Sequence, residues 1–246
     1  VAMSEEQQPR PLPPTAVYLE RLVKQFGAKM AVADLSLTVP VGSFYGLVGP
    51  NGAGKTTTLS MATGLLHPDA GRAFVHGVDV WQEPIKAKSL IGNLADGVRL
   101  FDRLTGEQLI VYTGMMFGLE REDVRARTAD LLQLMDLTQA AGTPVVDYSA
   151  GMTKKIALAC ALVHAPKLLV LDEPFESVDP VSAANIEDVL RSYTASGGTV
   201  IVSSHSMDLV QRMCDHVAVI SAGRVVAAGK IDEVRGGQSL QERFID

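Results

Sequence analysis

The chain has 246 residues, of which 47% are hydrophobic and 20% are charged, and its formal net charge is −6 at pH 7. A chain of this length and composition can bury a sizeable apolar core, which excludes disorder of the whole chain and predicts one folded domain, with or without an inserted piece. The composition also argues against a nucleic-acid partner, because a general grip on phosphate backbones needs clustered Lys and Arg.

The first 14 residues are polar and rich in proline, which predicts a flexible leader, with the folded domain over residues 15–246. The leader contains no apolar segment of the kind that a secretory signal needs. The longest uninterrupted apolar run, over residues 156–163, has eight residues, whereas a helix that crosses a bilayer needs about 18 or more. We therefore expect a cytoplasmic protein that does not cross a membrane by itself.

Two kinds of strand pattern follow along the chain. Apolar and polar residues alternate over parts of residues 17–48, which predicts antiparallel strands with one face toward water, and the last strand of this stretch covers residues 44–48. Continuous apolar runs at residues 168–171, 200–202 and 217–220 instead predict parallel strands that helices cover on both faces.

The pattern as a whole predicts an α/β fold with a parallel-sheet core over residues 15–95 and 164–246, an N-terminal antiparallel β part and an α-helical insertion over residues 96–163. Cys160 and Cys214 occur in apolar, helix-like surroundings. We expect both to be reduced, buried thiols rather than a disulfide or a metal site.

Three helices are expected within the insertion. Thr105 and Gln108 have the spacing of a capping box at the start of the first helix. Apolar residues recur at helical spacing over residues 122–135 and predict the second. The third is expected to begin after Ser149 and to end before Pro166, because proline does not fit a helix interior.

A glycine-rich segment, Gly49-Pro50-Asn51-Gly52-Ala53-Gly54-Lys55-Thr56-Thr57, lies between the strand at residues 44–48 and a helix expected over residues 55–66, and it has the G-x-x-x-x-G-K-[ST] spacing of a phosphate-binding loop. Glycines let successive N–H groups point at phosphate oxygens, and the helix adds its positive N-terminal end. Lys55 would reach the β and γ phosphates and Thr56 would be a ligand of Mg²⁺. The alternative is a glycine-rich turn with an incidental lysine. The residues expected to bind phosphate are Gly49, Asn51, Gly52, Ala53, Gly54, Lys55, Thr56 and Thr57.

Two adjacent carboxylates, Asp172 and Glu173, follow the apolar strand at residues 168–171. Ligands of open α/β sheets bind at the carboxyl ends of the strands. We assign Asp172 to Mg²⁺ and Glu173 to the orientation or deprotonation of an attacking water. The alternative is that the two acids only flank a turn or cap a helix.

Together these segments resemble the nucleotide-binding subunits of the ATP-binding cassette (ABC) family, over nearly the whole chain from Ala16 to about Arg235. The discriminating segment is Tyr148-Ser149-Ala150-Gly151-Met152, which is similar to the family's L-S-G-G-Q signature and departs from it at Ala150 and Met152. The resemblance implies a P-loop NTPase (RecA-like) core, and it implies that Ser149 and Gly151 contact the γ-phosphate of ATP held by an opposite subunit. An ordinary helix cap at Ser149 is the alternative, and it is compatible with that role.

The resemblance assigns roles to three further residues. His205 corresponds to a switch histidine that senses the γ-phosphate and supports hydrolysis, although a histidine at a strand end is often structural. Asp179 corresponds to a loop residue that communicates across the dimer. Phe26 corresponds to an aromatic residue that stacks on adenine, and its alternative is a core aromatic of the first sheet.

Asp96 is the largest departure from the family pattern, which usually has Gln at this position as a ligand of Mg²⁺, in a loop that contacts the membrane partner. Asp is one methylene shorter and carries a charge, so it is still expected to reach the metal directly or through water.

The resemblance implies an ATPase that binds ATP and Mg²⁺ and pairs head to tail with a second ATPase subunit, expected to be identical. Because the chain has no spanning run, the membrane permease is expected to be a separate polypeptide, with this chain peripheral on the cytoplasmic face of the membrane. Bacterial exporters of drugs, lipids or similar apolar cargo are the expected group.

Two rival functions remain open from the sequence. One is a soluble ABC ATPase without a transport role, such as an assembly factor. The other is a GTPase or a nucleotide kinase, which would carry an N-K-x-D segment or an Arg-rich lid, and we find neither in the sequence.

Overall fold

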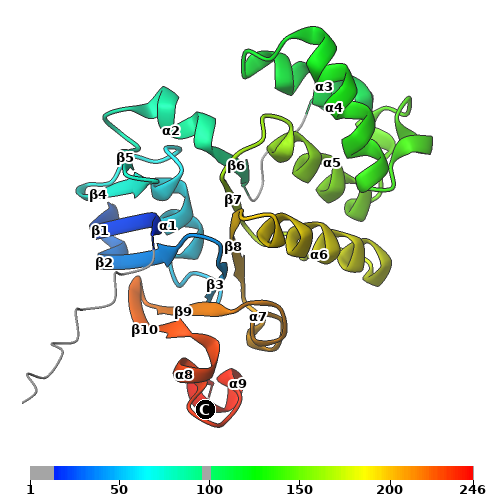
Figure 1. Cartoon of the computed structure of the whole chain (residues 1–246). Coiled ribbons are helices and arrows are strands. Elements are labelled where there is room, and N and C mark those ends of the chain that lie inside the picture. The colour runs from blue at the N-terminus through cyan, green and yellow to red at the C-terminus, as the bar shows by residue number, and fades with distance from the viewer. Residues whose placement is uncertain (1–13, 96–100, 246) are drawn as a thin grey trace, which may run out of the picture.

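The computed structural model describes residues 14–95 and 101–245, which form two β-sheets and a set of helices (Figure 1). Of the leader expected over residues 1–14, only Pro14 lies within the described residues. None of the described helices combines the length and the apolar character that crossing a membrane requires.

The larger sheet has six strands in the order β10-β9-β3-β8-β7-β6. Its five strands from β9 to β6 are parallel, and β10 joins the edge in antiparallel orientation to β9. The central strands are buried on both faces, as continuous apolar runs predict. The strands are β3 (Phe44–Val48), β6 (Ile91–Leu94), β7 (Leu168–Leu171), β8 (Thr199–Ser204), β9 (His216–Ser221) and β10 (Arg224–Lys230).

The smaller sheet is antiparallel and has the order β2-β1-β4-β5. Its long strands β1 (Thr15–Phe26) and β2 (Lys29–Pro40) alternate between buried and exposed residues over much of their length, as their sequences predict. β4 (Ala70–Val75) and β5 (Val78–Asp79) complete it. One expectation is wrong: β3 does not belong with these strands, because all five of its residues are buried and it lies between β9 and β8 in the parallel sheet.

Helix α1 (Lys55–Ala62) packs between the two sheets. One hydrophobic cluster joins Leu59 and Met61 of α1 to Leu19 of β1 and to Tyr45 and Leu47 of β3. The helix ends four residues before the expected end at Leu66, because Gly64 adopts a left-handed conformation (φ 83°) and the N–H groups of the next two residues return to the carbonyl of Ser60.

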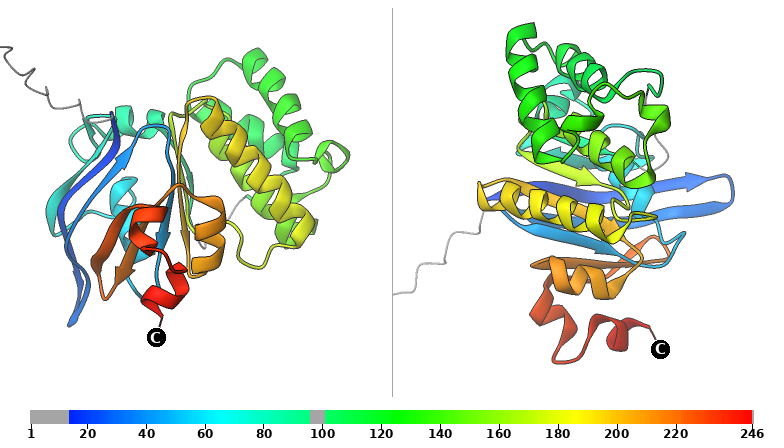
Figure 2. Two further views of the ribbon diagram at one scale, coloured as in Figure 1. Left: turned by 60° about the horizontal axis from the view of Figure 1, so that its bottom comes forward. Right: turned by 90° about the vertical axis from the view of Figure 1, so that its right-hand side faces the viewer.

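The opposite face of the large sheet is covered by α5 (Ala150–Leu162), α6 (Pro180–Ala195) and α7 (Met207–Met213) (Figures 1 and 2). The three expected helices are α3 (Gly106–Met116), α4 (Arg121–Leu134) and α5 (Ala150–Leu162). Thr105 and Gln108 form the predicted capping box, and α5 ends before Pro166. The remaining helical segments are α2 (Pro84–Leu90), η1 (Thr138–Ala140), η2 (Val145–Asp147), α8 (Ile231–Arg235) and α9 (Leu240–Phe244).

The C-terminal end of helix α5 lies directly against strand β6. A Cβ atom on Gly92 would overlap the carbonyl oxygen of Ala161, so the two backbones can approach this closely only because this position is glycine. His164, just beyond the helix, has its Nε2 2.8 Å from the carbonyl oxygen of Ile91 and stacks on Phe117 of the segment that follows α3. The end of α5 is therefore fastened to the sheet.

Both cysteines are free and buried, as expected: Cys160 faces α3 and Cys214 follows α7. Burial raises the pKa of the Cys160 thiol to about 11, with a small opposing contribution from Thr113. At neutral pH this thiol is therefore protonated and unreactive.

Candidate functional site

The segment after β3 folds as a loop that leads directly into α1, the arrangement that its glycine spacing predicts. Gly54 precedes the helix in a left-handed conformation (φ 106°), and a Cβ there would lie 2.6 Å from the carbonyl oxygen of Ala31. The N-cap residue, Gly54, has no side chain with which to cap α1. The first N–H groups of the helix are therefore available to an anion, and the helix dipole favours negative charge at this point.

The side chain of Lys55 folds back over the loop. Its Nζ donates hydrogen bonds to the carbonyl oxygens of Gly49 and, at 3.2 Å, Pro50. Burial lowers the pKa of Lys55, and the charges of Glu173 and Asp172 raise it in part. A buried ammonium group that is held by neutral carbonyls is well placed to exchange these partners for phosphate oxygens.

Thr56 and Asp172 meet across the loop, although 116 residues separate them. The Thr56 hydroxyl donates to Oδ2 of Asp172 at 2.8 Å, and the hydroxyl of Ser203 donates to the other oxygen, Oδ1. Asp172 is only 4% exposed. A hydroxyl beside one carboxylate is a hard-oxygen set that fits Mg²⁺, which usually takes one or two protein ligands and completes its shell with water and phosphate.

Glu173 lies at the end of β7 in a left-handed backbone conformation (φ 47°), which costs about 1–3 kcal/mol for a residue other than glycine. Its Oε1 is 3.3 Å from Nδ1 of His205. Burial raises the pKa of Glu173, and the neighbouring His205 and Lys55 offset part of that rise. A carboxylate with a raised pKa is a stronger base than an ordinary one.

Lys55, Thr56 and Glu173 line one cavity of about 340 Å³, which we call the loop cavity, whereas Asp172 and His205 are not among its lining residues in the described part of the chain. It is lined by Lys29, Ala31, Asn51, Gly52, Ala53, Gly54, Lys55, Thr56, Thr57, Glu173 and Glu176. Of the predicted phosphate-binding residues, only Gly49 is absent from this lining, and it contacts the site through its carbonyl oxygen.

Phe26 does not line the loop cavity. It lies at the end of β1 opposite Lys29, which does line the cavity, and its ring is exposed, with Nζ of Lys24 5.5 Å from the ring centre. The exposed ring is not a core aromatic residue, the alternative that the sequence left open.

The signature segment, residues 148–152, forms the N-terminus of α5, outside the loop cavity. Ser149 is exposed and caps the helix, where its Oγ accepts from the N–H of Met152 at 3.2 Å. A Cβ on Gly151 would lie 2.5 Å from Oδ1 of Asp179, so the start of α5 packs tightly on the start of α6. Ser149, Gly151 and Asp179 are not among the residues that line the loop cavity in the described part of the chain.

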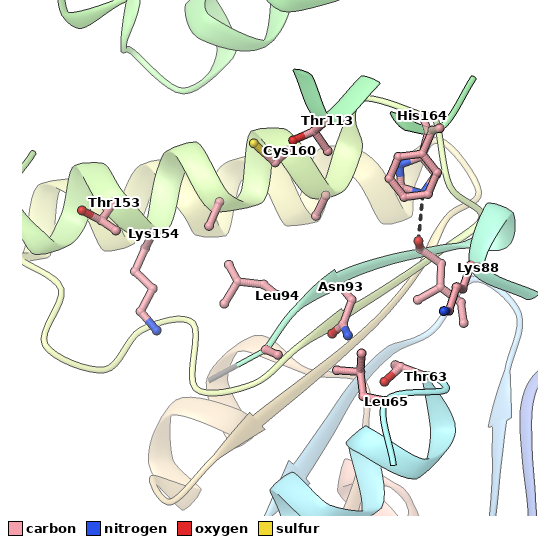
Figure 3. Close-up of a pocket in the computed structure, with 15 residues that line it drawn as sticks. Thr63, Leu65, Lys88, Asn93, Leu94, Thr113, Thr153, Lys154, Cys160 and His164 are labelled. Carbon is pink, nitrogen blue, oxygen red and sulfur yellow. Dashed lines mark hydrogen bonds between the residues drawn. The ribbon is translucent and has the colours of Figure 1, made fainter. Parts of the chain in front are cut away.

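Asp96 lies outside the described residues. The preceding residue, Ala95, lines a second cavity of about 430 Å³, which we call the α5 cavity (Figure 3). The α5 cavity lies between α5, β6 and the segment after α1, and apolar atoms dominate its lining. Residues that line it include Leu65, Leu94, Phe117 and Ala157.

Several residues of the site were not identified from the sequence. Lys29 and Ala31 enter the loop cavity because the β1–β2 hairpin folds over the loop. Ser203 contacts both Asp172 and Glu173. A signal for Ser203 does exist: it lies at the carboxyl end of the apolar strand β8, the end of a parallel strand at which ligands bind.

Comparisons with known proteins show the family to which this chain belongs. The profile of the ABC transporter family matches residues 32–176. The linearmycin resistance ATP-binding protein LnrL of Bacillus subtilis is 36% identical over 210 residues, which are 85% of this chain and 68% of that protein. The Nod factor export ATP-binding protein I of Burkholderia lata is 38% identical over 218 residues, which are 89% of this chain and 72% of that protein.

The daunorubicin resistance ATP-binding protein DrrA3 of Streptomyces coeruleorubidus is 37% identical over 221 residues, which are 90% of this chain and 70% of that protein. Among solved structures, an ATP-binding subunit of an ABC transporter superposes with a TM-score of 0.86 at 27% identity, covering 94% of this chain and 98% of the other.

Proposed function

We propose that this chain, which belongs to the ABC transporter family, is the ATP-hydrolysing subunit of an exporter whose membrane permease is a separate polypeptide. The chain is an ABC ATPase with the P-loop NTPase fold that its sequence predicts. One observation supports the proposal most directly: Lys55, Thr56, Asp172 and Glu173 converge on the loop, whereas Ser149 is exposed at the start of α5 and does not line the loop cavity.

In the proposed mechanism the triphosphate of ATP lies over the loop and the N-terminus of α1. Lys55 turns from the carbonyls of Gly49 and Pro50 to the β and γ phosphates. Thr56 and Asp172 would hold Mg²⁺, which would neutralise phosphate charge when bound. The exposed ring of Phe26 would stack on adenine at the rim of the loop cavity.

Glu173 would then accept a proton from the water that attacks the γ-phosphate. Its raised pKa makes it a better base, and His205, at 3.3 Å, keeps its carboxylate oriented and would sense the γ-phosphate. Phosphate leaves after the Pγ–O bond to ADP breaks, and the proton leaves with the products.

The exposed position of Ser149 supports a head-to-tail pair of chains. Its hydroxyl and the N–H groups at the start of α5 form an anion site that a phosphate bound on the loop of the same chain would not meet. In the pair, Ser149 and Gly151 of each chain would complete the ATP site of the other, and Asp179, packed against Gly151, would lie beside the shared contact.

The permease contact would lie at the α5 cavity, next to Ala95, on the cytoplasmic face of the membrane. Relatives that are named for linearmycin resistance, daunorubicin resistance and Nod factor export support an export role.

The pairing is tested with Glu173→Gln, which should slow hydrolysis by at least about 10²-fold and so hold ATP in place. We expect light scattering to show twice the monomer mass when Mg²⁺ and ATP are added to this variant. The second substitutions Ser149→Arg and Lys55→Ala should each abolish the pairing. A Glu173→Gln chain that binds ATP and stays monomeric, even with the permease present, would contradict the proposal.

The transport role is tested by purifying the tagged chain from membranes of its own cells. We expect an integral membrane protein to copurify with it, and the ATPase rate to change when that protein is reconstituted in vesicles. Recovery only in a soluble complex would favour the assembly-type ATPase instead.

A further inference from the structure

The peptide units on both sides of Glu173 are held by side chains from two different parts of the fold. Its N–H donates to Oγ of Ser203, on the neighbouring strand β8, at 2.9 Å. Its carbonyl oxygen accepts from Nζ of Lys154 on α5 at 3.1 Å, and also from the N–H of Glu176 at 3.3 Å. These contacts hold the left-handed conformation that aims the Glu173 side chain.

Lys154 is half-buried and lines the α5 cavity, where Figure 3 shows its side chain extending away from the helix. No carboxylate lies within 4.0 Å of its ammonium group in residues 14–95 and 101–245. Hydrogen bonds with a charged donor are stronger than neutral ones, so the hydrogen bond to Glu173 constrains the carbonyl more than a neutral donor would.

Lys154 lies on the same helix as Ser149, five residues further along, which is about 7.5 Å along the helix axis. Helix α5 thus carries an exposed anion site at its start and a contact with the catalytic carboxylate's backbone near its middle. A displacement of the helix start relative to the sheet would also displace Lys154.

We propose that Lys154 is a positioning residue for Glu173, through which the placement of α5 controls how well Glu173 is aligned for hydrolysis. The inference rests on the proposed function, because it gives Glu173 the role of the base. Among the described residues, Lys154 is not part of the lining of the loop cavity, where ATP is proposed to bind. It acts on the Glu173 carbonyl, so ATP binding does not depend on it.

The test is steady-state hydrolysis by the full chain and three lysine variants. Lys154→Met keeps the length of the side chain and removes the donor, Lys154→Arg keeps a charged donor, and Lys86→Met is a matched control on the exposed face of α2. We expect Lys154→Met to lower kcat by about 10-fold to 100-fold, the range for a misplaced catalytic group, while KM for ATP stays within about twofold. Lys154→Arg should recover most of kcat.

A second comparison separates positioning from a general structural role. In a Glu173→Gln background, Lys154→Met should cause no further loss of kcat, because both substitutions act on one group. The inference would be overturned if Lys154→Met lowered kcat in the Glu173→Gln background by the same factor as in the unmodified chain. It would also be overturned if Lys154→Met alone had the kcat of the unmodified chain. If Glu173→Gln itself hydrolyses ATP normally, the proposed function fails instead.

Discussion

The Ser203 hydroxyl holds Glu173 and Asp172 at once: it accepts from the N–H of Glu173 at 2.9 Å and donates to Oδ1 of Asp172. Ser203 is 1% exposed, so water does not replace either contact. One buried hydroxyl therefore links the residue expected to bind metal to the residue expected to activate water.

Replacing Ser203 with Ala should reduce both stability and turnover. The N–H of Glu173 would be left unsatisfied near the core, which costs about 1–3 kcal/mol in the free energy of unfolding. We expect urea denaturation to show this loss, and kcat to fall several-fold with little change in ATP binding. Ser221→Ala, at an exposed strand end, is the control, and equal unfolding midpoints for both variants would contradict the argument.

Replacing Thr56 with Ala should raise the Mg²⁺ concentration that half-saturates hydrolysis. The Thr56 hydroxyl is 2.8 Å from Asp172, and loss of such an oriented group weakens metal sites by roughly 10–100-fold. Thr56→Ser keeps the hydroxyl and should retain most of the affinity. A magnesium titration of the ATPase rate checks this, and an unchanged half-saturation point in Thr56→Ala would remove Thr56 from the metal site.

The rate should fall at acidic pH because Glu173 must be deprotonated to act as a base. Burial raises the pKa of Glu173, whereas His205 lowers it in part. Activity is therefore present above this pKa and is lost as the pH falls through it. Removing the partner with His205→Ala should raise the pKa and move the acidic limb of kcat to higher pH. A limb that stays in place or moves to lower pH would show that His205 does not stabilise the Glu173 carboxylate.

Replacing Gly151 with Ala should destabilise the contact between α5 and α6, although alanine is normally the better helix former. The added Cβ would lie 2.5 Å from Oδ1 of Asp179 and from Oγ of Ser182. Overpacking of this kind costs about 1–3 kcal/mol, and we expect thermal unfolding to show a lower midpoint. In Gly142→Ala, where a Cβ meets nothing within 4 Å, the midpoint should stay close to that of the unmodified chain.

The contiguous motifs could be predicted from the sequence because their chemistry depends on spacing along the chain. The phosphate loop, the two acids after β7 and the capping box at Thr105 each lie within a few residues. Contacts that depend on strand order could not be predicted in this way. Ser203 reaches Glu173 only because β7 and β8 are neighbours, with Leu171 opposite Val202.

The assignment of β3 failed for a related reason. Its five residues are apolar or small, and such a short run does not reveal which sheet it joins. The role of Lys154 could not be predicted because its partner is a main-chain carbonyl, and no pattern of side chains in the sequence indicates such a contact. The edge strand β10 was not predicted, although residues 225–228 form a short apolar run; in the fold its residues alternate between exposed and partly buried.

Because Gly92 of β6 lies against Ala161, the C-terminal end of α5 is the point about which this helix would tilt. Ser149 lies twelve residues from Ala161, so a tilt of about 10° there would swing the start of the helix by about 3 Å and Lys154 by about 2 Å. A swing of 2 Å is enough to break a hydrogen bond of 3.1 Å. A small tilt of α5 about its C-terminal end would therefore break the hydrogen bond between Lys154 and the carbonyl oxygen of Glu173, and Glu173 would lose its alignment.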